Sequence, residues 1–418
     1  MRKKTLLIFI LIILIPIAYR GFYQAFSPKT PNVERPSLVD NGELLVDNIP
    51  LDEEEDLVHG EEKLYPGDPL EPTAINIDLL AVGDIMFHKP QIEAARIEGG
   101  GYDFNPVFTY VREYIENADL ALANYETVTV SNREYSGYPR FNSPIETIQA
   151  LKEAGFDILS TANNHSLDQG KEGIRSTIEA IAHYGLRHVG TNLDKDLKPL
   201  IVDVKGIQIG VMSYTYGLNG LESLLSEEEL SYMVNLIDEG RIREEIKRLK
   251  EAGADIIISY IHWGNEYQHE PSQQQMSLGR KLVDWGVNIV LGSHPHVIQK
   301  AEILESNGKD NLILYSMGNF LSNQREVTMG NPYTEDGVMV RISLEKDMHL
   351  NEIRIVEIEY IPTWVYRYSE GGRLKYEILP SEEVLAGSLG IDLDSYIMDR
   401  VKKSYRDVKA VLEDLEDF

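Results

Sequence analysis

Polar side chains that can bind metal ions stand directly after several short apolar segments of the chain. In residues 158–170, ILSTANNHSLDQG, an apolar run ends in Asn163, Asn164 and His165. The residues that follow such segments are Asp84, His88, Asn124, Glu126, Asn163, Asn164, His165, His262, His294 and His296. Carboxylate, amide oxygen and imidazole nitrogen are ligands of divalent ions such as Mn, Fe, Zn or Mg. Because five of the ten histidines fall in this set, the pattern favours a metal site over unrelated polar loops.

Two neighbouring metal ions need a carboxylate between them, and Glu126 or Asp84 could be that shared ligand. A pair of divalent ions lowers the pKa of a bridging water and clamps the oxygens of a phosphoryl or acyl group. We therefore expect two divalent cations as cofactors. They would also supply positive charge for an anionic substrate.

Composition narrows the possible chemistry. The chain has no cysteine, which excludes disulfides, thiolate metal ligands and a nucleophilic thiol. Its 68 Asp and Glu residues outnumber 40 Lys and Arg residues, so the net charge is -28. This charge repels the phosphate backbone of nucleic acids, and we expect no nucleic-acid partner.

The amino-terminal part differs from the rest of the chain. A basic start at residues 2–4 precedes an apolar run over residues 5–18, and aromatic residues follow. This predicts an uncleaved signal anchor over residues 1–26, with a cleaved signal peptide as the alternative. Residues 27–73 contain proline and are strongly acidic, which predicts a disordered linker. We expect a single-pass protein of the cell membrane with most of the chain outside the cytoplasm.

From about residue 74, helical patterns alternate with short apolar segments. Three helical stretches end at Gly155, Gly253 and Gly286, and an apolar run follows each of them. Short apolar strands between helices are typical of parallel sheets covered on both faces. In such sheets, ligands bind at the carboxyl ends of the strands.

Local signals predict individual elements of this α/β fold. The pairs Ser143 with Glu146 and Ser272 with Gln275 predict capping boxes at two helix starts, and residues 105–117 predict a helix. Alternating runs on both sides of Lys205-Gly206 predict a hairpin, and apolar stretches over 311–320 and 337–361 predict a second sheet. We expect a four-layer α/β/β/α sandwich over residues 74–370 and a helical extension over 371–418.

Six segments occur in the order seen in one known family. VGDIMFH, ANYE, STANNHSLDQG, IHWGNEY, GSHPHVIQ and YSMGNF resemble CapA/PgsA-type capsule (poly-γ-glutamate) biosynthesis proteins, from about residue 77 to residue 320. This resemblance implies a calcineurin-like metallophosphoesterase fold. It also implies a role in making, exporting or anchoring poly-γ-glutamate or a related anionic surface polymer, with membrane synthase subunits as partners.

The resemblance implies roles for single residues as well. The implied metal ligands are Asp84, Glu126, Asn164, His262, His294 and His296. His165 is implied as the proton donor or oxyanion contact. The aspartate–x–histidine pair of standard phosphoesterases is absent, because Ile85 and Met86 follow Asp84, and His88 is a candidate replacement with a catalytic role. Position alone suggests substrate contacts from Asn124, Asn163, Arg140 and Asn319, although Asn163 could instead form the turn.

Two functions remain open on the sequence. The first is a metal-dependent hydrolase or transferase acting on phosphoryl or γ-glutamyl groups, with metal-activated water and His165 as proton donor. The second is a non-catalytic accessory subunit of a membrane poly-γ-glutamate synthase or export complex. The predicted anchor and the absent aspartate–x–histidine pair motivate this alternative.

Overall fold

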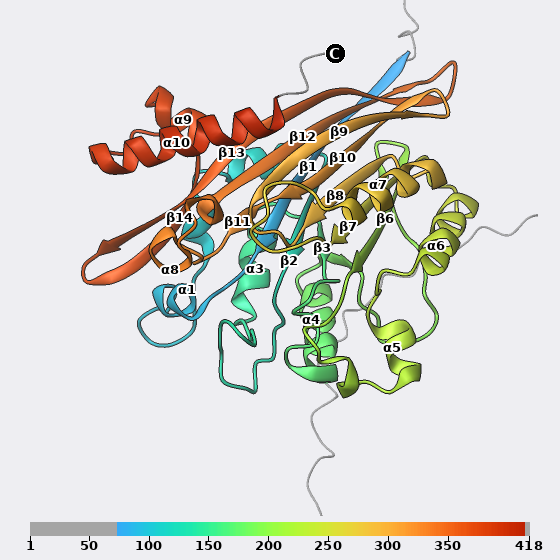
Figure 1. Cartoon of the computed structure of the whole chain (residues 1–418). Helices are drawn as coiled ribbons and strands as arrows, with labels where there is room; N and C mark the ends of the chain where they lie inside the picture. Colours follow the sequence, from blue (N-terminus) through green and yellow to red (C-terminus); the bar gives the residue numbers. More distant parts are fainter. Residues whose placement is uncertain (1–72, 414–418) are drawn as a thin grey trace, which may run out of the picture. The chain divides into compact units, whose positions relative to one another are not determined.

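A computed structural model of the chain describes residues 73–413, which form two β-sheets that face one another (Figure 1). The first sheet contains, in spatial order, β14 (Arg373–Pro380), β13 (Glu352–Glu370), β12 (Asp336–Asp347), β1 (Ala74–Ile85), β2 (Leu120–Tyr125), β3 (Ile158–Ser160) and β4 (Arg187–Val189), with β11 (Asn319–Leu321) beside β1. The second contains β5 (Leu200–Val204), β6 (Ile207–Thr215), β7 (Ile256–His262), β8 (Ile289–Ser293), β10 (Lys309–Met317) and β9 (Ile298–Ser306).

Most helices cover the outer faces of the two sheets, whereas the C-terminal helix packs through Val408 and Leu412 against the core between them. In chain order, the α-helices (α) and 3-10 helices (η) are α1 (Lys89–Ala94), η1 (Asn105–Phe108), α2 (Arg112–Glu116), α3 (Glu146–Glu153), α4 (Gly170–His183), η2 (Glu222–Leu224), α5 (Glu227–Met233), α6 (Glu239–Glu251), α7 (Gln273–Trp285), α8 (Glu326–Met329), η3 (Pro332–Glu335), α9 (Ser381–Ala386) and α10 (Ser395–Leu412). Helices α1 to α4 pack on the first sheet, and α6 and α7 pack on the second. Between the sheets lies a core that includes Leu79, Leu122, Ile258 and Leu291. The predicted four-layer α/β/β/α arrangement is confirmed by these layers.

Several local predictions are confirmed. Ser272 Oγ accepts from the Gln275 amide in the capping box of α7, and Gly286 ends this helix at a φ of 107°. The left-handed conformation at Gly286 is one that a residue without a Cβ adopts at little cost. Lys205 and Gly206 form the turn of the β5–β6 hairpin, with Val204 opposite Ile207.

Other local predictions differ from the structure. The Ser143 hydroxyl bonds Thr127 Oγ1 at 2.8 Å, and α3 begins only at Glu146 without a side-chain cap, so this tertiary contact replaces the predicted capping box. The helix predicted over 105–117 is split into η1 and α2. The predicted helical extension over 371–418 begins with strand β14, because this segment completes the edge of the first sheet.

The predicted second sheet is also assembled differently. Residues 311–320 contribute mainly to β10, which pairs with β8 and β9 of the second sheet. The stretch 337–361 instead forms most of β12 and about the first half of β13. In the first sheet, β12 pairs with β1, and β13 pairs with β12. The two apolar stretches therefore belong to different sheets. Pairing with strands distant in sequence determines which sheet each stretch joins.

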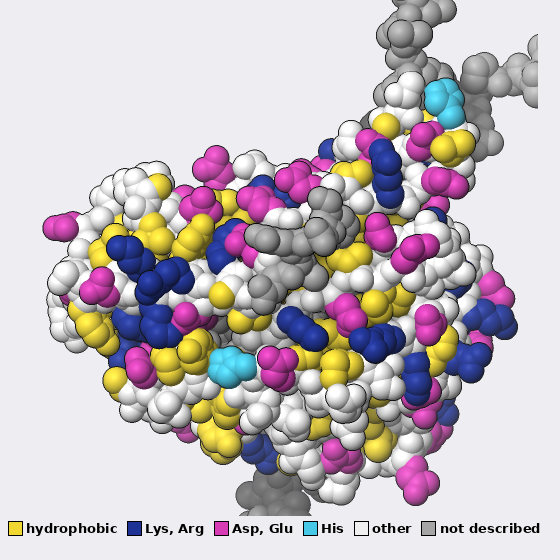
Figure 2. Space-filling model, turned by 45° about the horizontal axis from the view of Figure 1, so that its top comes forward, with side chains coloured by type: hydrophobic (Ala, Val, Ile, Leu, Met, Phe, Trp, Pro, Cys, Tyr) yellow, Lys and Arg dark blue, Asp and Glu magenta, His cyan; other side chains and the backbone are white. Residues whose placement is uncertain are grey.

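The amino-terminal predictions lie outside the described residues. The signal anchor over 1–26 and all but the last residue of the linker over 27–73 belong to this part. Among the described helices, none combines the length and apolar character required to cross a bilayer. Acidic and basic side chains are interspersed over the face seen in Figure 2, so no large field of one sign covers that face.

Parallel pairing brings the carboxyl ends of the central strands together. Asp84 at the end of β1 is the partner of Asn124 on β2 and of Asn319 on β11. A Cβ at Gly83 would lie 2.1 Å from Gly318 O, so only glycine allows β11 to approach this closely. Across the sandwich, the Tyr260 hydroxyl donates toward the Val82 and Leu122 carbonyls at 3.0 and 3.2 Å. The corresponding edges of the two sheets are therefore held next to each other.

Candidate metal centre

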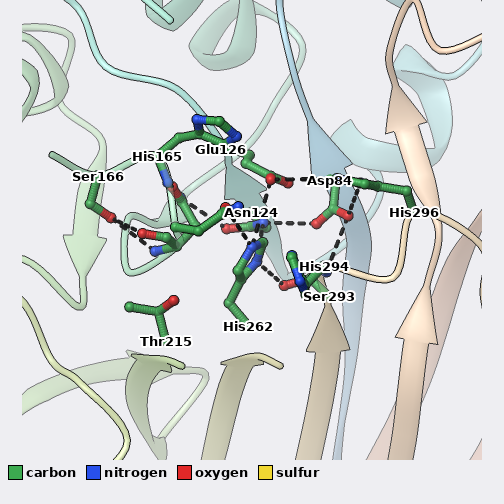
Figure 3. A network of polar contacts seen from close by, with 12 residues as sticks. Asp84, Asn124, Glu126, His165, Ser166, Thr215, His262, Ser293, His294 and His296 are labelled. Atoms are coloured by element: carbon green, nitrogen blue, oxygen red, sulfur yellow. Dashed lines mark hydrogen bonds and ion pairs between the residues drawn. The ribbon is translucent and has the colours of Figure 1, made fainter. Parts of the chain in front are cut away.

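Asp84 is fully buried where the two sheets meet. Its Oδ1 accepts a hydrogen bond of 2.8 Å from Asn124 Nδ2. Its Oδ2 accepts one of 3.2 Å from the His294 amide and lies 3.0 Å from His296 Nδ1. This carboxylate thus connects β2 of the first sheet with the loop that follows β8 in the second (Figure 3).

Glu126, which follows β2, is the least satisfied carboxylate of the cluster. It is fully buried, and neither Oε1 nor Oε2 has a hydrogen-bond partner among residues 73–413. Its Oε1 lies 3.6 Å from His262 Nε2 and 3.9 Å from His296 Nε2. Burial, followed by the charge of Asp84, raises the pKa of Glu126 well above its usual value. A cation beside Glu126 would stabilise its charged form.

Two imidazoles near Glu126, those of His262 and His294, are held in the neutral form. Burial, followed by the charge of His294, lowers the pKa of His262 well below its usual value. Burial, followed by the charge of His296, lowers the pKa of His294 to about 3. His294 Nδ1 has no hydrogen-bond partner within the described part of the chain. Neutral imidazoles are the form of histidine that binds metal ions.

Neighbouring polar groups orient these ligands. His262 Nδ1 lies 3.0 Å from Ser293 Oγ, and its Nε2 lies 3.0 Å from Asn164 Oδ1. Asn164 Nδ2 donates to Asn219 Oδ1 at 3.2 Å, which leaves the Asn164 amide oxygen facing His262. The motif pattern does not predict that Ser293 and Asn219 orient these ligands, because neither residue type is diagnostic of a metal site.

The loop after β8 carries two of the imidazoles in an uncommon backbone conformation. His294 has a φ of 98° and His296 a φ of 58°, values that residues with a Cβ rarely adopt. Such strain is concentrated at functional sites, where the surrounding structure maintains it. Here it accompanies the placement of both imidazoles beside Asp84 and Glu126.

Two overlapping groups of side chains could each hold a metal ion. One consists of Glu126, His262 and His294, and the other of Asp84, Glu126 and His296, with ligand atoms within 4.8 Å of one another in each group. Glu126 belongs to both groups, as a carboxylate shared by two adjacent cations would. The unpartnered atoms of Glu126 and His294 are those that a cation would satisfy. The donor set therefore fits divalent ions of the Mn, Fe, Zn or Mg class.

His165 is paired with a carboxylate that the motif pattern left without a role in the site. Its Nδ1 lies 2.7 Å from Asp168 Oδ2, which also accepts the Phe141 amide at 2.7 Å. The Phe141 ring packs edge-on against the imidazole at 4.7 Å between centroids. The motif pattern did not predict this pairing, although the spacing of three residues within NNHSLDQG was a usable signal.

His88 does not join the metal-binding groups. Its Nδ1 accepts the Asn323 amide at 3.3 Å, and its ring packs against Phe141 at 5.2 Å between centroids. Burial is the largest cause that lowers the pKa of His88, to about 4. Within the described residues, the groups of side chains close enough to hold a metal do not include it. The structure thus gives no support to a replacement of the missing motif histidine by His88.

The asparagines predicted to contact substrate are buried and bonded within the protein. Asn124 Nδ2 donates to Asp84, as described above. Asn163 Nδ2 donates to the Tyr125 carbonyl at 2.9 Å, and its Oδ1 accepts the His165 amide at 3.1 Å. Asn319 Oδ1 lies 3.0 Å from His296 Nδ1, and its Nδ2 donates to the Thr334 carbonyl at 2.9 Å. These contacts favour supporting roles, and for Asn163 the turn-forming alternative.

Arg140 is exposed next to the His165–Asp168 pair. Its Nε donates to the Asp168 carbonyl at 3.0 Å. Together with Arg133, Gln169 and Leu224 it lines an open depression beside Asp168. Arg140 is therefore placed where it could hold an anionic group close to the cluster.

These features define a class of protein: a four-layer α/β protein with a buried carboxylate–imidazole centre whose side chains could hold a metal ion. The bacterial capsule synthesis protein family PGA_cap has a model that matches residues 78–324, more than half of the 418 residues. The chain belongs to this family, in agreement with the resemblance of the six ordered segments.

Two relatives of the chain are biosynthesis proteins that share the name CapA. The chain is 31% identical over 276 residues to the capsule biosynthesis protein CapA of Bacillus anthracis. It is 28% identical over 272 residues to the PGA biosynthesis protein CapA of Bacillus subtilis. Both matches cover 64% of this chain, and they cover 64% and 67% of the relatives, so about a third of each relative lies outside the match.

Among solved structures, the calcineurin-like phosphoesterase YfkN of Bacillus subtilis is similar with a TM-score of 0.38 and 14% identity. The match covers 80% of this chain and 98% of that one. Scores at this level support no assignment of activity.

Proposed function

We propose that this protein is a metal-dependent hydrolase or transferase of capsule synthesis, acting on phosphoryl or γ-glutamyl groups of poly-γ-glutamate or a related anionic surface polymer. The observation that carries the proposal is the buried, unpartnered carboxylate of Glu126, which belongs to both groups of candidate metal ligands. Membership of the capsule synthesis family, and the names of the two CapA relatives, support the choice of polymer.

The proposal includes a location outside the cytoplasm. The apolar run over residues 5–18, with its basic flank at residues 2–4, supports an N-terminal membrane anchor. The acidic stretch that follows would act as a spacer between this anchor and the sandwich. A surface polymer would then be handled close to the membrane, where synthase subunits are candidate partners.

Each of the two cations would have ligands of its own, and both would share the Glu126 carboxylate. Asp84, Glu126 and His296 would hold one cation. Glu126, Asn164, His262 and His294 would hold the other. Bound there, a pair of divalent ions supplies Lewis acidity for attack on a phosphoryl or acyl group.

His165 is positioned to move a proton. Asp168 Oδ2 accepts a hydrogen bond from His165 Nδ1, so the imidazole orientation is fixed and Nε2 is the nitrogen left to exchange a proton. A general acid at this place would protonate the leaving oxygen or nitrogen of the substrate. The buried Phe141 ring against the imidazole limits access of water from that side.

The depression lined by Arg133 and Arg140 would bind the polymer next to this proton donor. A poly-γ-glutamate chain carries one carboxylate per residue, and guanidinium groups bind carboxylates in a planar, two-bond geometry. These two side chains lie on the exposed side of Asp168. The substrate would thus extend from the metal centre across this depression.

The test uses the purified full-length chain loaded with Mn²⁺. Hydrolysis of a phosphodiester and shortening of poly-γ-glutamate are measured for the wild type, Glu126→Gln and the remote exposed control His349→Ala. We expect turnover of one substrate class by the wild type and by His349→Ala, and loss of it in Glu126→Gln. If the metal-loaded wild type turned over neither substrate class, the enzyme proposal would be wrong.

The accessory alternative makes a different prediction in cells. If turnover is absent, but His294→Ala and His296→Ala proteins fold and still support polymer production, a non-catalytic subunit is the better description. If production stops while folding and partner binding stay normal, the metal centre itself is required and the accessory alternative loses its basis.

A further inference from the structure

A third group of potential ligands includes a residue that no motif argument assigned to the site. The Glu266 carboxylate lies with the ring nitrogens of His294 and His296 in a group whose ligand atoms are within 4.8 Å of one another. His294 and His296 are only 3% exposed, whereas Glu266 is exposed. The group therefore has a buried side made of imidazoles and an open side made of one carboxylate.

The loop that carries Glu266 is held against the histidine loop. The Tyr267 amide donates to the Pro295 carbonyl at 2.8 Å, which joins the segment after β7 to the segment after β8. Tyr267 adopts a φ of 65°, and the preceding turn contains Gly264 at a φ of 90°. A Cβ at Gly264 would lie 2.6 Å from the Gln275 side chain. Glu266 is thus carried by a constrained turn beside the metal-binding imidazoles.

The group formed by Asp84, Glu126 and His296 is short of ligands. It offers three side chains, whereas divalent cations of this class take about four to six ligands. Strand β1 cannot supply another, because the residue two after Asp84 is Met86, which is 1% exposed among apolar neighbours, and His88 is bonded to Asn323. An additional oxygen must therefore come from outside β1.

We propose that Glu266 is an additional metal ligand, which coordinates a cation from the solvent side together with His294 and His296. This inference rests on the proposed metal centre, and it assigns to the segment IHWGNEY a second ligand besides His262. Being the exposed ligand, Glu266 is also the one that an anionic oxygen of a substrate can displace without opening the buried side. His294 belongs to the same group and its Nδ1 has no hydrogen-bond partner within the described part of the chain, which supports a cation here.

The inference is tested by metal binding and needs no substrate. Full-length protein is stripped of metal, and Mn²⁺ binding is followed by titration calorimetry together with metal content per chain. The variants are Glu266→Gln, Glu266→Asp, His296→Ala, and Glu270→Gln, which changes an exposed acid four residues further along. We expect Glu266→Gln to weaken the binding of one ion by at least about tenfold, because even outer contacts of a metal site contribute this much.

The pattern across variants decides the outcome. Support for the proposal requires His296→Ala to weaken the same ion, Glu266→Asp to bind better than Glu266→Gln, and Glu270→Gln to match the wild type. If Glu266→Gln bound both ions like the wild type while His296→Ala lost one, Glu266 would not be a ligand, although the proposed function would stand. If the wild type bound no ion, the metal-dependent function would fail together with this inference. Equal unfolding midpoints of the metal-free variants exclude misfolding as a cause.

Discussion

At the scale of single residues, Glu126 shows how a buried charge points to a missing partner. A carboxylate that is removed from water without a hydrogen bond destabilises the folded protein unless it is protonated or paired. Asp84, by contrast, has three polar contacts from within the chain. The difference between the two acids locates the place where a cation contributes most.

We predict that divalent metal stabilises the protein through Glu126. Saturation at about 100 times the dissociation constant contributes about 2.7 kcal/mol per ion, because the ion binds only the folded chain. Thermal unfolding with Mn²⁺ and with EDTA measures this gain for the wild type and for Glu126→Gln. An equal gain in both proteins would show that Glu126 does not hold the ion.

A second residue-scale prediction concerns the His165–Asp168 pair. The change Asp168→Asn removes the carboxylate that fixes His165, so the rate of substrate turnover should fall by up to about 10²-fold, the lower range of general acid catalysis. Metal content should stay unchanged, because Asp168 is outside the ligand groups. The pH profile of turnover distinguishes this role, since a purely structural change would lower the rate equally at all pH values.

The site residues were accessible from the sequence to different degrees. Six candidate ligands follow apolar segments in the sequence: Asp84, Glu126, Asn164, His262, His294 and His296. The structure brings these residues together, because parallel strands end at a common edge. Asp168 and Glu266 do not directly follow apolar segments, so this pattern does not select them. The position of Glu266 depends on loop contacts such as that between Tyr267 and Pro295. His88 is close to Asp84 in sequence, but this closeness does not fix where its ring points, and its ring lies outside the groups of candidate metal ligands among the described residues.

At the scale of elements, the capping-box pattern predicted the start of α7 correctly and the start of α3 incorrectly. The Ser272 box caps α7, but Ser143 bonds Thr127 instead and α3 starts without a cap. A serine three residues before Glu or Gln is thus only a local preference, and a competing tertiary hydrogen bond can override it. Strand assignment to one sheet or the other fails for the same reason, because partners distant in sequence decide it.

We predict that Ser272→Ala lowers the free energy of unfolding by about 1 kcal/mol, the usual cost of losing a helix N-cap. The exposed Ser277 within the same helix provides a matched control, since alanine is the better helix former there. Urea unfolding of both variants gives the comparison. A loss in Ser277→Ala as large as that in Ser272→Ala would contradict the capping role.

At the scale of the whole molecule, a buried acid of the first sheet lies close to polar side chains of α10. Asp336 at the start of β12 is 3% exposed. Burial raises its pKa from 3.8 to about 7, although the Ser404 hydroxyl and the Arg400 charge on α10 act in the opposite direction. Between these two pH values the folded protein keeps a proton that the unfolded chain has released.

The contribution of Asp336 to stability should therefore fall as the pH rises from about 4 to about 7, because this carboxyl binds more protons in the folded state than in the unfolded state in this interval. The variant Asp336→Asn cannot lose this proton, so its unfolding free energy should decline less over the same range. Urea titrations at several pH values, performed in EDTA to remove any contribution of bound metal, compare the two slopes. Parallel slopes would refute the assignment.

The division of the metal ligands between the two sheets has a consequence for how the protein is made. Asp84, Glu126 and Asn164 follow strands of the first sheet, whereas His262, His294 and His296 belong to strands and loops of the second. During synthesis, the growing polypeptide exposes a lone set of acids until nearly three hundred residues have been joined. Under the proposed function, capture of the ions would be a late event that requires docking of the two sheets, and a polypeptide that ends before these histidines could not retain them.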